Sequence, residues 1–494
     1  MFNPFKLLLG SGGSSRSIEA SGRGRRLKSL EATRQHINQQ IEAAGETITA
    51  RARWLVVNDG YAESGLNQWV NACVGEGITL SPPEEVRPHW KKWSKNCDAD
   101  GIYSFAGLQS LIASETFIAG ECFIRRRKRK TRDMPGIAPF KIQVLPSEML
   151  DVSYTQLLSN GNRIRSGIEF NKIGERVAYH FFRNHPGDVA GFGDLRGLRV
   201  RVLARDIIHV MDPIFAGQRR GISRFKNAIM PLFFLRAYDD AELERKIVAA
   251  LFGGVITEEQ GPANLNPDSE DEEEFDDFGQ LEPGGLLKLR PGEKFETVSP
   301  ADVGGSYEAF QYRALLRASA SLRVPYAYVT KDTTRGNFSN VRTDLLSFRK
   351  EAKKWGRNVI IDQVTRRVYD WFLQAIYFAD LEQLENYPSD PDAYEPTAFP
   401  PRQEWIDPAK DIKAEIDAID AGLKTRTESA AESGRDINEI DEKRAEELAN
   451  ERDKKLRYST SQSPVSTSEN KPPAQEQSKE PEESEEDEQE PKRD

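Results

Sequence analysis

The sequence SYEAFQYRALLRASASLRVPYAYVTKDTTRGNFSNVRTDLLSFRKEAKKW, residues 306–355, decides our interpretation of the whole chain. In its first part, apolar residues recur at spacings of three and four, the pattern of one face of an α-helix. Pro325 ends this helix, because proline has no N–H for the helical ladder and disfavours helical backbone in the residue before it. Residues 331–340 are polar and aperiodic, and helical spacing returns from Val341. The stretch therefore predicts a helix, a polar loop and a second, longer helix.

The composition limits the function. With 494 residues the chain is long enough for about two to four domains and a substantial core. It has 69 Lys and Arg residues against 79 Asp and Glu residues, a formal net charge of −10. This charge argues against a protein that grips DNA by neutralising its phosphates. No apolar run approaches the ~20 residues that span a bilayer, so we expect no membrane partner.

Several residue patterns argue against a catalytic or metal-binding function. The three cysteines (Cys73, Cys97 and Cys122) are far apart, so we expect free thiols in a reducing compartment, with no disulfide and no zinc site. The glycine-rich GSGGSSRS near the start lacks the Gly-Lys-Ser/Thr ending of a phosphate-binding loop. The histidines within residues 180–209 lack metal-ligand spacing. We therefore predict no catalytic residue, no metal and no cofactor.

Residues 27–220 show helical patterns followed by strand patterns. Helical spacing covers about 27–50, 62–74 and 105–119, and strand patterns cover 120–127 and 141–212. Between the last two helical segments, the proline-rich SPPEEVRPHW at 81–90 is expected to break regular structure. The most basic run of the chain, RRRKRKTR at Arg125–Arg132, has two interpretations. It contacts nucleic acid or an acidic partner, or it is a solvated hairpin tip. Because no aromatic residues for base stacking interleave with it, we favour the hairpin tip.

Residues 221–304 combine a long helix, predicted over 221–252, with a low-complexity segment. In Asp268–Asp277, DSEDEEEFDD, eight of ten residues are acidic. The carboxylates of a two-metal nuclease come from separate strands that fix them in space. These carboxylates are consecutive and repel one another, so we predict a mobile, solvated loop.

The C-terminal part begins with a proline-rich connector at Pro388–Pro401. Asp407 and Pro408 fit a helix start, with an acidic N-cap before a proline in the first turn. From Ser459 onward apolar residues almost vanish, and residues 462–494 hold 11 acidic and 4 basic residues. This composition predicts a disordered acidic tail.

Five segments carry a resemblance to a known family. They are WLVVNDGYAESGLNQWVNACVGEGITL at 54–80, YDDAELERKIVAALF at 238–252, YEAF at 307–310, VPY at 324–326 and NFSNVRTDLLSFR at 337–349. In this order and spacing, over about residues 54–435, the chain resembles the portal proteins of tailed bacteriophages, in the lambda-type branch. The resemblance implies a mixed α+β portal fold with a helical stem and crown and a β-rich wing and clip, assembling into a ring.

The resemblance also implies what the protein does. Portal rings, usually dodecamers of about twelve copies, form at one capsid vertex the channel for DNA packaging and ejection. The expected partners are other copies of the chain, double-stranded DNA in the channel, the terminase large subunit, the head–tail adaptor protein and the major capsid protein. The expected location is the capsid vertex of the virion, after assembly in the host cytoplasm.

The domain division implied by the resemblance follows the chain. It comprises a flexible N-terminal arm at 1–26, a wing at 27–220, a first stem helix at 221–252, a clip with the acidic loop at 253–304, a second stem helix at 305–325, a tunnel loop at 326–340, a long wing helix and connector at 341–400, a helical crown at 401–458 and a disordered acidic tail at 459–494. The tunnel loop is expected at the narrowest level of the channel.

Three sets of residues are candidates for function. The tunnel-loop set is Lys331, Asp332, Thr333, Thr334, Arg335, Asn337, Ser339 and Asn340. The set for docking the motor at the clip is Asp268, Glu270, Asp271, Glu272, Glu273, Glu274, Asp276 and Asp277. The stem set is Tyr238, Asp239, Asp240, Glu242, Arg245, Lys246, Tyr307, Phe310, Arg313 and Arg317. In the loop, Lys331 and Arg335 are expected to touch passing phosphates, and Asp332 keeps the attraction weak enough for DNA to slide.

Two other classes of function stay open. A packaging or maturation enzyme, either a nuclease or an ATPase, would need a Walker-type loop or acidic residues dispersed over strands, and the sequence shows neither. A monomeric capsid scaffolding or adaptor protein is the second alternative. The mass of the purified protein separates that alternative from a ring.

Overall fold

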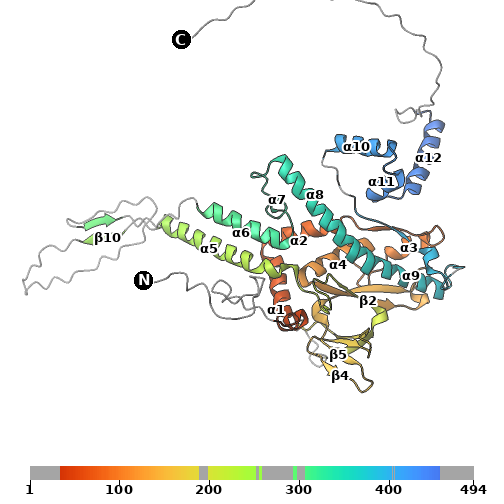
Figure 1. Ribbon diagram of the computed structural model, residues 1–494, viewed down its shortest axis with the longest axis horizontal. Helices are drawn as coiled ribbons and strands as arrows, with labels where there is room; N and C mark the ends of the chain where they lie inside the picture. The colour runs from red at the N-terminus through yellow and green to blue at the C-terminus, as the bar shows by residue number, and fades with distance from the viewer. Residues whose placement is uncertain are drawn as a thin grey trace, which may run out of the picture. The chain divides into compact units, whose positions relative to one another are not determined.

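The computed structural model describes residues 34–188, 198–251, 255–258, 293–296, 306–385, 387–402, 404 and 407–456 (Figure 1). The chain divides into two compact units, and the boundary falls between Asp436 and Ile437. The expected N-terminal arm, the acidic segment Asp268–Asp277 and the tail from Ser459 lie outside the described residues.

Helices form most of the described chain. They are α1 (Ile37–Asn58), α2 (Gly60–Cys73), α3 (Arg87–Ser94), α4 (Phe105–Ala119), α5 (Ile229–Leu251), α6 (Ser306–Leu322), α7 (Tyr326–Thr330), α8 (Phe338–Trp355), α9 (Arg366–Phe378), α10 (Pro408–Asp420), α11 (Arg426–Glu432) and α12 (Ile437–Asp453), and a π-helix, η9 (Gly356–Thr365), joins α8 to α9. Of these, α12 alone belongs to the second unit.

The described strands form four antiparallel sheets. They are β1 (Thr79–Ser81), β2 (Glu121–Lys128), β3 (Phe140–Pro146), β4 (Gln156–Leu157), β5 (Arg163–Arg165), β6 (Ile168–Phe170), β7 (Arg176–Phe182), β8 (Arg199–Leu203), β9 (Ile207–Met211), β10 (Val255–Glu258), β11 (Glu293–Glu296) and β12 (Thr397–Phe399). The sheet orders are β3-β2-β9, β4-β5-β6-β7-β8, β1-β12 and β10-β11. The mixed helix and sheet content agrees with the fold class expected from the sequence.

The main core of the first unit lies where α2, α4 and α8 meet. Trp69 of α2 is fully buried, with its ring centroid 6.0 Å from that of Phe117, 6.1 Å from that of Phe348 and 5.8 Å from that of Trp355. Truncating a buried aromatic side chain of this kind costs about 3–5 kcal/mol. The helix that follows the predicted loop is therefore built into the centre of the unit.

Several predicted elements appear with the expected bounds, and two predictions are wrong. The helix at 105–119 and the strand after it are confirmed as α4 and β2. We expected the proline-rich residues 81–90 to break structure, but Pro88 occupies the first turn of α3, where its missing N–H costs nothing. We also expected a loop over 326–340. Residues 326–330 instead form α7, and Asn337 caps α8, so the loop is confined to 331–337.

The segment between α8 and α9 is wider than an ordinary helix. In η9 the backbone N–H of Arg366 donates to Ile361 O, a spacing of five residues rather than four, and the Thr365 hydroxyl donates to Ile360 O at 2.8 Å. At its start, a Cβ on Gly356 would lie 2.8 Å from the carbonyl oxygen of Cys73 at the end of α2. Only glycine lets the long helix pass α2 this closely.

Two backbone segments also pass each other closely at Gly120, the residue that ends α4. Its φ is 87°, in the left-handed region, and a Cβ there would lie 2.2 Å from the backbone carbon of Ile222. The crossing brings the start of β2 against the segment that leads to α5.

We predict that Gly120→Ala lowers the free energy of unfolding by more than about 3 kcal/mol, because left-handed strain adds to a backbone clash. Gly101→Ala is the matched control, since Gly101 also has a positive φ, 75°, but nothing lies within 4 Å of its Cβ position. That control should cost about 1–2 kcal/mol. Chemical denaturation checks both variants, and equal losses would show that the crossing is not close.

Candidate functional site

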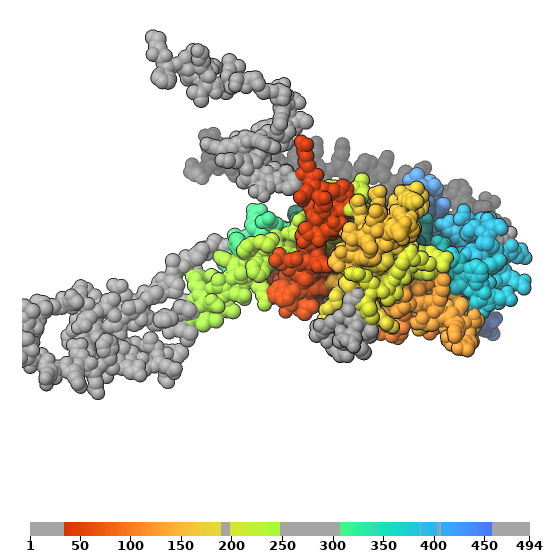
Figure 2. Space-filling model, turned by 90° about the horizontal axis from the view of Figure 1, so that it is seen from below, coloured from red at the N-terminus to blue at the C-terminus, as the bar shows by residue number. Residues whose placement is uncertain are grey.

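The two helices predicted as a stem lie side by side as an antiparallel pair that extends away from the sheets (Figures 1 and 2). Aromatic rings join them: the Tyr238 ring on α5 stacks on that of Tyr307 on α6, with centroids 5.7 Å apart, and lies 4.5 Å from that of Phe310. The helical spacing of YEAF on α6 places both of its aromatic rings against α5. The sequence thus builds the contact from one ring on α5 and two on α6.

Polar contacts reinforce the pair. The Tyr307 hydroxyl donates to Asp239 Oδ1 at 3.0 Å, and the Lys246 ammonium lies 5.4 Å from the centroid of the same ring. Within α5, Arg245 donates to both carboxylate oxygens of Glu242, at 2.9 and 2.7 Å. The structure thus brings seven of the ten predicted stem residues together.

The other three predicted stem residues, Asp240, Arg313 and Arg317, are exposed, and among the described residues their side chains have no hydrogen-bond or ion-pair partner. Arg313 and Arg317 are four residues apart and so lie on one face of α6. This leaves two cations on a helix surface that other molecules can reach.

The loop at 331–337 is held by its own polar groups. Lys331 has a φ of 62° and ends α7. The Asp332 carboxylate accepts hydrogen bonds from the Thr334 amide and hydroxyl, at 2.9 and 2.5 Å, and from the Tyr326 hydroxyl at 3.1 Å. The Thr334 hydroxyl and amide hold the pKa of Asp332 below its usual value. Thr333 is exposed, and its carbonyl oxygen accepts from the Gly336 N–H at 3.2 Å.

Arg335 ties this loop to α6. Its guanidinium forms an ion pair with Glu308 and lies 4.3 Å from the ring centroid of Tyr312. The Tyr312 ring in turn meets that of Tyr326 of α7 edge to face, with centroids 5.1 Å apart. We expect Arg335 to touch passing phosphates, and in the described structure its guanidinium also contacts Glu308 and Tyr312 of α6.

The other predicted loop residues divide between loop and helix. Lys331 is exposed, and its side chain has no partner among the described residues. It borders a hollow of about 530 Å³ that is also lined by Asp59 of the α1–α2 junction and Asp239 of α5. Asn337 accepts the Asn340 N–H at 2.8 Å as the N-cap of α8. Ser339 and Asn340 therefore belong to the first turn of α8 rather than to the loop.

A largely buried arginine below the helix pair, with 13% of its side chain exposed, was not predicted. Arg224 precedes α5 and lies 3.8 Å from the ring centroid of Trp69. Glu351 of α8 lies 3.9 Å from it and also accepts from Arg323, at 2.9 Å, beyond the end of α6. Burial and then the charge of Arg323 lower the pKa of Arg224. Asp212 also lies 3.7 Å from the Arg224 guanidinium. No local sequence pattern marks an arginine whose aromatic partner and second carboxylate, Trp69 and Glu351, lie more than 100 positions away.

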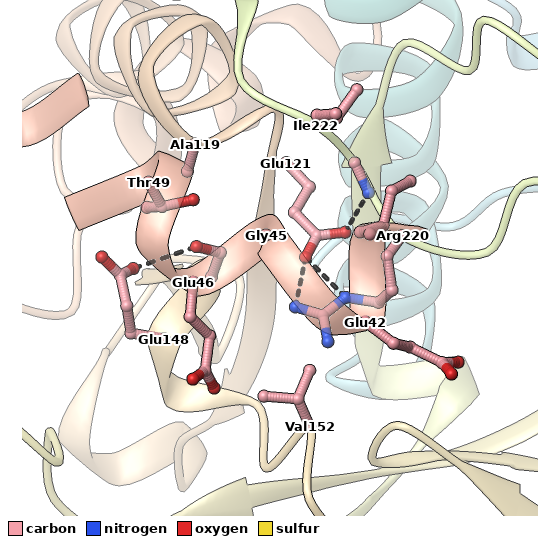
Figure 3. A pocket seen from close by; sticks show the side chains of 13 residues that line it. Glu42, Gly45, Glu46, Thr49, Ala119, Glu121, Glu148, Val152, Arg220 and Ile222 are labelled. Carbon is pink, nitrogen blue, oxygen red and sulfur yellow. Dashed lines mark hydrogen bonds and ion pairs between the residues drawn. The ribbon is translucent and has the colours of Figure 1, made fainter. Parts of the chain in front are cut away.

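The segment that leads to α5 is anchored by a buried carboxylate (Figure 3). Glu121, at the start of β2, accepts from Arg220 Nε at 2.6 Å and from the Gly221 N–H at 2.6 Å, and its Oε2 lies 2.8 Å from His209 Nε2. Burial opposes the charge of Glu121, but Arg220 and His209 outweigh it and lower its pKa to about 2. A small cavity of about 40 Å³ lies beside this cluster, with Glu46 on its rim.

Metal clusters, disulfides and membrane-spanning helices are absent from the described residues. Among them, no group of three or more His, Cys, Asp or Glu side chains is placed to hold a metal ion. Cys73, Cys97 and Cys122 are buried and free, as expected. Within the described part of the chain, no helix combines the length and apolarity that crossing a membrane requires.

Comparison with known proteins gives a consistent family. The model of a family described as "Phage portal protein, lambda family" matches residues 23–355. The chain is 26% identical over 422 residues to the probable portal protein of Halomonas phage phiHAP-1, covering 80% of this chain and 78% of that protein. It is 21% identical over 470 residues to portal protein B of Escherichia phage lambda, covering 85% and 86%.

A comparison with solved structures gives a weaker likeness. A chain from the neck of a native GTA particle, described with C12 symmetry, aligns at 15% identity and a TM-score of 0.44, covering 79% of this chain and 93% of that one. A TM-score this low supports no conclusion about this chain.

We predict that Glu121→Gln lowers the free energy of unfolding at pH 7 by about 3 kcal/mol or more, since Arg220 then stays buried without its counter-charge. Glu46→Gln on the rim of the same cavity is the matched control. Glu46 is exposed and has no partner among the described residues, so it should change stability little. Equal effects of the two substitutions would contradict the anchoring role.

The same cluster predicts a dependence of stability on pH. The pKa of Glu121 falls from 4.5 to about 2 on folding, so its contribution is fully present above pH 4.5 and is lost as the pH falls towards 2. Burial lowers the pKa of His209 from 6.5, so protonation of the unfolded chain below pH 6.5 adds to the loss. Denaturation between pH 7 and pH 3 should show falling stability, with a smaller fall between pH 4.5 and 3 in Glu121→Gln.

Proposed function

The chain belongs to the lambda family of phage portal proteins, and we propose that its copies assemble through α1 and α5 into a ring that carries DNA. As a portal protein, it is a structural component of a phage and not an enzyme. Family membership removes the packaging or maturation enzyme as an alternative. The ring itself, its copy number and its contacts are the proposal.

The observation that supports assembly is an uncovered apolar surface on α5 and α1, which we call the α5 face. Met230, Phe233 and Phe234 are 50%, 54% and 57% exposed, and Trp54 and Val57 of α1 are 46% and 82% exposed. Figure 2 shows α5 in light green beside α1 in red, and Arg236 of α5 lies 5.1 Å from the Trp54 ring centroid. Single exposed apolar residues are ordinary, but a cluster of this kind marks an interaction surface.

A second copy of the chain is the occupant that we propose for the α5 face. One side of the pair meets α7 and the loop through Tyr312 and Glu308. On α5, Met230, Phe233 and Phe234 stay exposed in an isolated copy. In a circular assembly, each copy would cover the α5 face of the next and bury the aromatic side chains of that face. Closed symmetric assembly is the usual form of such repeated contacts.

The channel surface that we propose is made by α6 and the loop at 331–337. Arg313, Arg317 and Lys331 are exposed cations without described partners, whereas Arg335 is already paired. Each copy thus offers few charges to phosphate. Weak attraction suits DNA that has to slide, because every additional phosphate contact strengthens salt-dependent binding.

The further roles follow from the family and stay predictions. We propose that the ring occupies a capsid vertex against the major capsid protein, docks the terminase large subunit during packaging and later seats the head–tail adaptor. The acidic segment Asp268–Asp277 is proposed as the motor contact. The wing, stem, clip and crown keep the bounds given above as proposals, and the tunnel loop is proposed at 331–337.

We predict that Phe233→Asp with Phe234→Asp prevents ring assembly while leaving each copy folded, because buried unpaired carboxylates at the α5 face would cost several kcal/mol per copy. Light scattering after size-exclusion chromatography measures the mass. Ile412→Asp with Ile416→Asp on α10 is the control, since these residues are also exposed, 38% and 52%, but lie outside the α5 face. Intact rings in the first variant would overturn the proposed interface.

We predict that Lys331→Ala with Arg335→Ala leaves rings intact and alters DNA packaging or retention. Lys331→Ala alone removes a free cation without disturbing the contact of Arg335 with Glu308 and Tyr312. If the single substitution changes packaging, the charge handles DNA. If only the double variant does, the tie between loop and α6 is what matters. Normal packaging in both would remove these side chains from DNA handling.

A further inference from the structure

A basic hollow lies between the sheet of β2 and β3 and the sheet of β7 and β8. Its volume is about 440 Å³, and its lining includes Arg125, Arg127 and Arg183 together with Gln143, Leu145 and Phe182. None of the residues that line it is acidic. We call it the arginine hollow.

Strand alternation explains why only part of the basic run faces the arginine hollow. Arg125 and Arg127 are two positions apart on β2 and point to one side, whereas Arg126 points to the other. There Arg126 donates to Asp206 at 2.9 Å and to Gln374 at 3.0 Å, and lies 5.2 Å from the Trp371 ring centroid. Arg126 therefore stabilises the fold. Arg125 and Arg127 do not take part in these contacts and face the hollow, where they can bind a ligand.

The arginines of the hollow lack a counter-ion in the described part of the chain. Neither Arg125, Arg127 nor Arg183 has an ion pair there. Asp206 is the carboxylate that acts on Arg125, and it is already held by Arg126 and, at 3.6 Å, by Lys128. Burial, and then the charge of Arg127, lower the pKa of Arg125. Partly buried like charges of this kind are stabilised when an anion enters.

An unused amide lies beside these arginines. Gln143 is opposite Arg125 in the β2–β3 register, and its Oε1 is buried without a hydrogen-bond partner in the described structure. Buried polar atoms nearly always have a partner. A peptide ligand would supply one through its backbone N–H, whereas a fully ionised phosphate diester has no donor.

We propose that the arginine hollow binds an acidic peptide segment of another protein. Its carboxylates would pair with Arg125, Arg127 and Arg183, a backbone N–H would donate to Gln143 Oε1, and an apolar side chain would pack on Leu145 and Phe182. A DNA duplex fits less well, because it is wider than a hollow of this volume and offers no apolar side chain. This site goes beyond the proposed channel and uses other residues.

The sequence itself offers two matched probes. The peptides DSEDEEEFDDF (residues 268–278) and EPEESEEDEQE (residues 480–490) have the same length and eight acidic residues each, but only the first contains phenylalanine. Fluorescence anisotropy of each labelled peptide with the full-length protein measures binding. The first peptide should bind at least tenfold more tightly than the second. Equal binding of the two would overturn the apolar contact.

The protein variants test the location. Arg125→Gln with Arg127→Gln should weaken binding of the first peptide at least tenfold, since each arginine makes a charge-assisted contact, and Arg125→Lys with Arg127→Lys should restore part of it. Arg129→Gln with Lys130→Gln removes the same charge at exposed positions beyond the hollow and should change binding less than twofold. Equal weakening by both glutamine pairs would show a diffuse charge effect and overturn the site.

Three further outcomes are decisive. Duplex DNA that binds, loses its binding in Arg125→Gln with Arg127→Gln and is not displaced by the peptide would assign the hollow to nucleic acid instead. If the labelled peptide is displaced at high protein concentration, the acidic segment of another copy of the chain competes for the hollow. That outcome would assign the ligand to the chain itself and not to another protein. Absence of peptide binding at low salt, where charge contacts are least screened, would overturn the proposal outright.

Discussion

The carboxylate of Glu121 stays ionised in a place that excludes water, and the arrangement of the first unit depends on how that charge is balanced. Arg220 supplies the opposite charge, and the Gly221 N–H and His209 supply the remaining contacts. These groups belong to β2, to β9 and to the segment before α5. A single side chain thus fixes where the helix pair leaves the sheets, and the glycine at 120 allows the required close approach.

Beyond this anchor, the helix pair and the loop at 331–337 are held by weaker contacts. Aromatic rings join α5 to α6, and Arg335 joins the loop to α6, at positions that are partly exposed. Exposed ion pairs contribute about 0–1 kcal/mol. The difference in strength separates a fixed base from a helix pair and loop whose contacts cost less to rearrange.

The sequence predicted what local patterns encode. The bounds of α4 follow from periodicity and from Gly120, and the family follows from five segments in a fixed order, as the comparison confirms. It did not predict α7, because a proline marks a helix end in the local pattern, whereas Pro325 is also the N-cap of the next helix. Nor could it predict that Glu121 contacts Arg220, or that Arg335 contacts Glu308. The tertiary fold brings such partners together, and no periodic pattern in the sequence marks them.

The π-helical turn between α8 and α9 sets the rotational phase of the helix that follows it. An α-helix turns by about 100° per residue, so a change in the number of residues per turn rotates every later side chain about the axis. With η9 in place, Val368, Phe372 and Ile376 are all buried. A one-residue deletion within 356–365 would turn that apolar row by roughly a quarter of a circle and expose it. The widened turn therefore sets the rotation of α9 relative to α8, so that each helix directs its apolar face towards its own neighbours.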